Sequence, residues 1–177
     1  MLGRFVKAVS DSLNLLARYG AILCVFLMFA TILVQVLARY VLNSPPAWTE
    51  EIARYMMVWS GMLGATLSFK RRQDPVLVED VLAGFPGPLR YLTKIVRSAA
   101  ILVFLLPVLY FSFFNLKGQY GKGYIGRQAA LTADTLGFPM SWIAIAVPLC
   151  TGIIIIHLMA RWAALNRSAG REEKQKG

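Results

Sequence analysis

The 177-residue sequence has few of the side chains that most enzymes use for chemistry. It contains one histidine, two cysteines and nine acidic residues against nineteen basic ones. A haem-binding membrane bundle needs facing axial ligands, which His157 alone does not supply. The run 118–123 lacks the spacing of a phosphate-binding loop, and we expect it to be a flexible external loop. The sequence therefore predicts a protein that is not an enzyme, with no catalytic residue, metal site or cofactor.

Charged residues make up 16% of the chain, whereas soluble domains have about a quarter. Hydrophobic residues reach 57% and the mean hydropathy is +0.56. The windows 19–38, 98–116 and 135–160 contain no charge, and about 20 helical residues cross a bilayer core of about 30 Å. The window 55–69 is shorter, so charged residues before it must lie at the membrane boundary. These patterns predict an all-α integral membrane protein with four transmembrane helices.

The residues between these windows suggest interfacial helices. Apolar side chains recur at helical spacing before Tyr19, with charges between them, which is typical of an amphipathic helix on a membrane surface. We expect one membrane domain over 1–177: an interfacial helix at 1–18, spans at 19–40, 48–69, 89–116 and 138–161, an interfacial segment at 75–83, a periplasmic loop at 117–137 and a cytoplasmic tail at 162–177. Cys24 and Cys150 fall at different predicted depths, so we expect them to be packing residues and not a disulfide.

The stretch 39–55 connects the first two spans. Pro45 and Pro46 are incompatible with a continuing helix. Thr49 is predicted to cap the next helix, and its first turn contains Glu50 and Glu51, where the helix dipole favours negative charge. Trp48 is suited to the boundary between water and lipid.

The net charge of +10 follows membrane topology and does not indicate nucleic-acid binding. Fourteen of the nineteen basic residues fall in the N-terminal segment, the connection between the second and third spans, or the C-terminal tail. The positive-inside rule therefore predicts that both termini are cytoplasmic. Attraction to anionic membrane lipids is a further consequence.

Several polar or small side chains in the first two spans are candidate interface residues. Gln35 either forms a hydrogen bond within the bundle or contacts a partner helix. Arg39 either contacts a partner helix or extends toward the lipid headgroups. In the second span, one helical face is lined by Glu50, Arg54, Met57, Gly61, Gly64 and Ser68. Small residues let helix backbones approach closely in lipid. This face is expected to receive a helix, either from the same chain or from another protein.

These residues resemble a known transporter family. The matching positions are 39–43, Pro46, the Trp48-Thr49-Glu50-Glu51 element, 53–55, Trp59 and 64–65, followed by a basic turn, 78–82, 138–142 and Pro148. Together they are similar to the small four-helix permease subunit, DctQ-like, of tripartite ATP-independent periplasmic (TRAP) transporters.

The resemblance implies a bacterial inner-membrane subunit that scaffolds a large permease subunit. In that family the large subunit contains the substrate and sodium sites, organic acids are taken up with sodium, and a periplasmic binding protein delivers the solute. Two alternatives remain open from the residues themselves. The chain could be the membrane anchor of a redox enzyme, or a small self-contained exporter.

Overall fold

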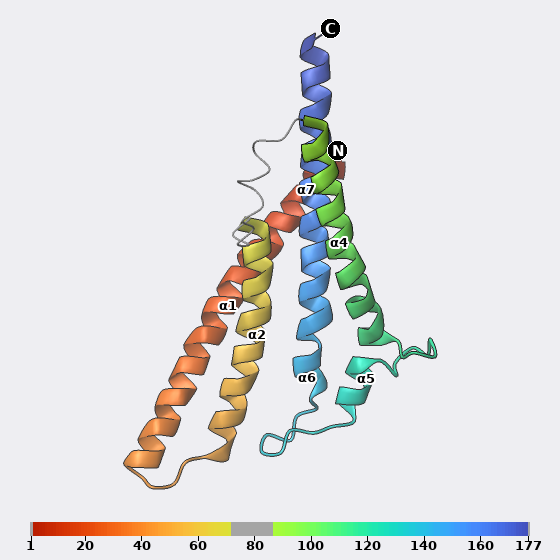
Figure 1. Ribbon diagram of the computed structural model, residues 1–177. Helices are drawn as coiled ribbons and strands as arrows, with labels where there is room; N and C mark the ends of the chain where they lie inside the picture. The colour runs from red at the N-terminus through yellow and green to blue at the C-terminus, as the bar shows by residue number, and fades with distance from the viewer. Residues whose placement is uncertain (1, 72–86, 177) are drawn as a thin grey trace.

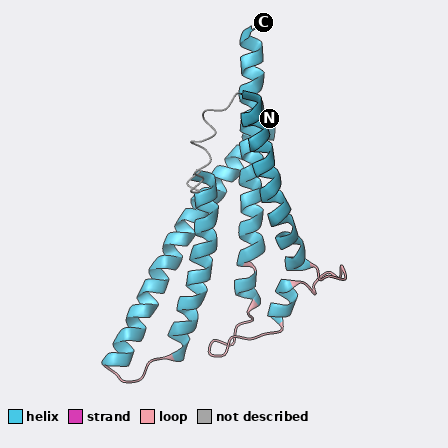
Figure 2. Cartoon of the chain, viewed as in Figure 1, coloured by secondary structure: helices cyan, strands magenta, loops and turns pink. Residues whose placement is uncertain are grey.

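The computed structural model describes residues 2–71 and 87–176. Nearly all of this part of the chain is helical, and its loops gather mainly at one end (Figure 2). The helices are α1 (Leu2–Tyr40), α2 (Ala47–Arg71), α4 (Gly87–Phe113), α5 (Tyr124–Ala129), α6 (Ser141–Ala144) and α7 (Ala146–Lys176). Three stretches are long and apolar enough to cross a membrane: Phe5–Tyr40, Ile95–Phe113 and Ser141–Ala163. The all-α membrane class is therefore supported, and α2 is not among these three stretches.

Helix α1 runs without interruption through the predicted boundary at residue 18. The candidate span in α1 covers 36 residues, or about 54 Å of helix, so an upright helix extends well beyond a core of about 30 Å. At the N-terminal end of α1, the side that faces the other helices carries polar or small residues. Ser10 and Ala17 are buried there, while Phe5 and Leu16 are 69% and 71% exposed. The location of residues 1–18 on a membrane surface stays a prediction.

The connection between α1 and α2 lies where the prolines predict it. The chain leaves α1 after Tyr40, and Asn43 adopts a left-handed conformation with φ of 50°, which asparagine tolerates better than most residues. The predicted cap at Thr49 is wrong, because α2 already begins at Ala47. The Thr49 hydroxyl instead donates a hydrogen bond of 2.7 Å to the Pro46 carbonyl and is fully buried.

Small residues bring α1, α2 and α7 together. The buried cluster contains Ala17, Leu63 and Cys150, one from each helix, and Trp59 of α2 packs against it. A Cβ at Gly20 would lie 3.1 Å from Leu63 Cδ1, so the missing side chain allows this close approach. Cys150 is a free, buried packing residue, as the sequence predicts.

The four long helices converge near the N-terminus of α1 and diverge toward the opposite end (Figure 1). The hairpin of α1 and α2 lies on one side of α7, and α4 lies on the other. Helices α1 and α4 have few buried residues over their apolar stretches, whereas α7 is the most buried of the three. The chain therefore presents large apolar surfaces on both sides of a central helix.

The second half of the chain differs in detail from the predicted boundaries. Helix α4 ends at Phe113 and not at 116, and Pro107 lies inside it. The last span begins at Ser141, is interrupted at Ile145 and continues as helix to Lys176. The loop predicted at 117–137 contains α5, and isolated bridges join Phe114 to Tyr120 and Thr132 to Pro139. The predicted interfacial segment at 75–83 lies outside the described residues.

Candidate functional site: an uncovered face of α2

One face of α2 is left uncovered by the described part of the chain. At its N-terminal end Glu50 and Arg54 form an ion pair of 3.0 Å, and both side chains are 64% exposed. One turn further on, Met57 is 57% exposed, and Gly61 is also exposed. The opposite face carries the buried residues that contact α1 and α7, including Leu63. Helix α2 thus packs with one side and leaves the other open.

Glycine makes the open face smooth. A Cβ added at Gly61 or Gly64 would meet no atom within 4 Å. Ser68, one turn beyond Gly64, is half-buried and continues the same face toward the other end of the helix. No helix in the described residues occupies this surface, which we call the glycine face. Of the two occupants that the sequence left open, a described helix of the same chain is therefore ruled out.

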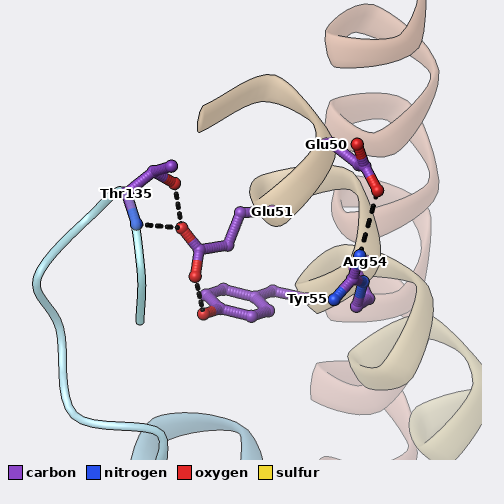
Figure 3. A network of polar contacts seen from close by, with 5 residues as sticks. All are labelled: Glu50, Glu51, Arg54, Tyr55 and Thr135. Carbon is purple, nitrogen blue, oxygen red and sulfur yellow. Dashed lines mark hydrogen bonds and ion pairs between the residues drawn. The ribbon is translucent and has the colours of Figure 1, made fainter. Parts of the chain in front are cut away.

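Glu51 points to a different side from Glu50 and joins α2 to a distant loop (Figure 3). Its carboxylate accepts a hydrogen bond of 2.6 Å from the Tyr55 hydroxyl. The other carboxylate oxygen accepts bonds from the hydroxyl and the amide of Thr135 and from the amide of Leu136, the two amide bonds being 3.2 Å long. One side chain therefore links α2 to the segment that leads into α6.

These donors favour the charged form of Glu51. The Thr135 hydroxyl has the largest effect, followed by the Tyr55 hydroxyl, and together they hold the pKa of the Glu51 carboxyl below its usual range. The residue directly follows Glu50, the acidic residue in the first turn of α2, and precedes the apolar part of the helix. At neutral pH Glu51 is therefore an ionised structural link.

The remaining predicted residues do not join the glycine face. Gln35 of α1 is half-buried and has no hydrogen-bond partner among the described residues, so contact with a partner helix stays a prediction. Arg39 is exposed at the end of the same helix. Trp48, in the first turn of α2, is 42% exposed, and its location at the membrane boundary stays a prediction.

A polar cluster that sequence reasoning missed lies at the end where the helices converge. Lys70 of α2 donates bonds of 2.7 Å to the Asp11 carboxylate and to the Ser10 carbonyl of α1. The Ser10 hydroxyl is 2.8 Å from Nδ1 of His157 on α7, and both residues are buried. Three helices are thus joined by polar contacts. A polar side chain within an apolar run, such as His157 after four isoleucines, is the signal that could have indicated them.

Two further contacts extend this cluster. The Arg161 guanidinium donates a bond of 2.8 Å to the Phe69 carbonyl and lies 4.7 Å from the centre of the Phe69 ring. The Trp162 indole donates a bond of 3.0 Å to the Ser98 hydroxyl, which connects α7 to α4. Polar contacts at the converging end therefore join α1, α2, α4 and α7. Within the described residues no group of three His, Cys, Asp or Glu side chains could hold a metal ion.

Comparison with known proteins indicates a transport role. A family model described as "Tripartite ATP-independent periplasmic transporters, DctQ component" matches residues 28–167. The sialic acid TRAP transporter permease protein SiaT of Haemophilus influenzae (strain 86-028NP) is 29% identical over 140 residues, which are 76% of this chain and 20% of SiaT. A putative TRAP transporter small permease protein of another H. influenzae strain (ATCC 51907 / DSM 11121 / KW20 / Rd) is 42% identical over 55 residues, which are 29% of this chain and 34% of that protein. The chain thus spans about a fifth of one relative and a third of the other.

Proposed function

The chain belongs to the DctQ component family of TRAP transporters, and we propose that it is the small membrane subunit of such a transporter. In this proposal it braces a large permease subunit within the bacterial inner membrane. The complex takes up organic acids with sodium, and a periplasmic binding protein delivers the solute. SiaT is named for sialic acid, which is itself an organic acid and fits this solute class.

The uncovered glycine face of α2 is the observation on which the proposal mainly rests. A lipid-facing helix gains nothing from glycine, because glycine lowers helix stability by about 1 kcal/mol relative to alanine. Gly61 and Gly64 nevertheless lie one turn apart with free space around them. Close backbone packing is the main use of such residues between membrane helices. The large permease subunit is the expected occupant.

Helix α2 is proposed as the fourth span. Its 25 residues give about 37 Å of helix, which is enough to cross the core. It follows α1 after a short turn, runs back alongside it (Figure 1), and packs against it through Leu63 and Ala17. Since α1 has the length and composition of a span, an antiparallel neighbour packed along it crosses the same layer. Polar residues in the first turn of α2 then lie at the external rim.

Four spans place both termini on one side of the membrane, and the distribution of basic residues makes that side the cytoplasm. Single cysteines at Ser44 and Gln119, in a chain without Cys24 and Cys150, should react with an impermeant thiol reagent in intact cells. Cysteines at Gln73, outside the described residues, and at Gln175 should react only after the membrane is opened. Labelling of either of these two positions in intact cells would contradict the topology.

Affinity purification in mild detergent from the native host tests the assignment. A large polytopic membrane protein should co-elute with the chain. A soluble subunit carrying a redox cofactor would instead identify the chain as the anchor of a redox enzyme. That outcome, or a reduced-haem absorbance band in the purified chain, would overturn the proposal.

A further inference from the structure

A short hairpin projects sideways from the external end of α4, away from the hairpin of α1 and α2 (Figure 1). It covers residues 114–120 and is closed by the bridge between Phe114 and Tyr120. The Asn115 side-chain oxygen accepts bonds of 2.9 and 3.0 Å from the amides of Lys117 and Gln119. Gly118 supplies the left-handed turn with φ of 72°. The backbone of the hairpin is therefore fixed by its own hydrogen bonds.

Aromatic rings attach the hairpin to α4. Tyr110 of α4 stacks on Phe114 with 4.9 Å between ring centres and an interplanar angle of 11°. Phe114 in turn contacts the edge of Tyr120, with ring centres 5.5 Å apart. Because these rings hold both ends of the hairpin, the position of its tip is set by the position of α4 in the membrane.

The length of α4 gives the depth of the hairpin. Its apolar stretch, Ile95–Phe113, has 19 residues and is about 28 Å long, which matches the hydrocarbon core. If α4 crosses the core, Phe113 lies at the external edge, and the residues that follow lie among the lipid headgroups. The hairpin leaves α4 at this level and extends laterally.

The side chains of the hairpin suit that location. Leu116, at the tip, is 92% exposed, and Tyr120 is 76% exposed. A leucine this exposed gains from leaving water. Lys117 and Lys122 are also exposed, and neither forms an ion pair within the described part of the chain. Apolar, aromatic and basic groups therefore lie together at one level, which is the composition of an interfacial anchor.

We propose that residues 114–122 insert into the external leaflet of the membrane and bind phospholipid headgroups. Leu116 enters the boundary between headgroups and acyl chains, and Tyr120 lies at the same boundary. Lys117 and Lys122 contact lipid phosphates. The hairpin thereby fixes the height and the tilt of α4, whose apolar stretch has few buried residues.

Fluorescence in lipid nanodiscs tests this surface. Leu116→Cys, in a chain with Cys24→Ala and Cys150→Ala, is labelled with an environment-sensitive dye. The discs contain phosphatidylethanolamine and phosphatidylglycerol. We expect blue-shifted emission, quenching by lipids spin-labelled near the headgroup, and protection from an aqueous quencher. A dye at Ser44→Cys, on the polar connection between α1 and α2, is the water-exposed control. Since Leu116 is almost fully exposed, its replacement leaves the fold intact.

Two comparisons distinguish contact of the hairpin with lipid from contact with a partner protein. Lys117→Gln combined with Lys122→Gln should increase aqueous quenching in discs with phosphatidylglycerol and change little in discs of neutral lipid. Adding the large permease subunit should leave the emission unchanged. Full access of the aqueous quencher to position 116 would overturn the proposal. Protection that develops only with the large subunit present would also overturn it, because the hairpin would then contact protein.

Discussion

Leucine at both Gly61 and Gly64 is expected to reduce co-purification of the chain with the large permease subunit by at least about tenfold. A factor of ten corresponds to about 1.4 kcal/mol of association free energy. Two leucines would hold the partner backbone away from α2, and close van der Waals packing provides much of the attraction between helices in lipid. The yield of the purified complex from co-expressed subunits, at equal membrane levels of both, measures the effect.

The same double variant should fold normally by itself. A Cβ added at either position meets no atom within 4 Å, so the melting temperature of the isolated chain should not fall. Gly20→Leu is the contrasting variant, because its Cβ would press on Leu63 within the chain. Overpacking of this kind costs about 1–3 kcal/mol, so Gly20→Leu should lower the melting temperature of the isolated chain.

Ala100→Leu serves as the matched control, since Ala100 is an exposed small residue of α4. It adds a side chain to an apolar membrane face away from the glycine face and should leave the complex intact. Normal assembly of the Gly61 and Gly64 double variant would mean that the glycine face meets lipid. Unfolding of that double variant in isolation would mean that the face packs within the chain.

Glu51→Ala is expected to lower the melting temperature of the isolated chain clearly more than Glu50→Ala. Glu51 accepts bonds from Tyr55, Thr135 and Leu136 and so joins α2 to the loop before α6. Glu50 forms one exposed pair with Arg54, and pairs of this kind contribute about 0.2–0.5 kcal/mol in water. Thermal unfolding of the three proteins in the same detergent gives the comparison.

Acidification should remove the difference in stability between Glu51→Ala and the parent chain. The Glu51 carboxyl has a folded-state pKa below its usual range, so its contribution to stability is present at neutral pH. That contribution is lost as the pH falls through the folded-state value, and Glu51→Ala then approaches the parent chain. A difference that persists unchanged in strong acid would mean that the ionised carboxylate is not the stabilising form.

The two glutamates also bear on transport. We expect both to act in structure and docking at the external rim, and not in sodium coupling. Glu50→Gln should therefore reduce uptake only as far as it reduces the yield of the complex. Normal assembly combined with loss of the sodium dependence of uptake would assign Glu50 to coupling instead.

The sequence was sufficient for features that depend on neighbouring residues. The uncharged windows in the sequence predicted the three apolar stretches. Pro45 and Pro46 predicted where α1 ends. The repeat of Gly61 and Gly64 on one side of α2 indicated the smooth face, because helical spacing alone decides which residues share a face. The start of α2 was less certain, since both Ala47 and Thr49 are compatible with a helix that begins after a proline.

Contacts between distant segments could not be predicted in this way. Glu51 and Thr135 are 84 positions apart, and Ser10 and His157 are 147 positions apart. Each pair depends on how the helices tilt and rotate relative to one another. The residue pattern of a single helix carries no information about that arrangement. The order in the loop after α4 was also missed. Its glycines suggest flexibility, whereas Gly118 serves a fixed turn.

Uptake into reconstituted vesicles tests the central claim most directly. Vesicles would contain this chain, the large permease subunit, or both, with the binding protein, its radiolabelled organic acid and an inward sodium gradient outside. The account predicts sodium-dependent uptake with both subunits and none with this chain alone. Uptake by this chain alone, or an undiminished rate with the large subunit alone, would contradict a bracing role.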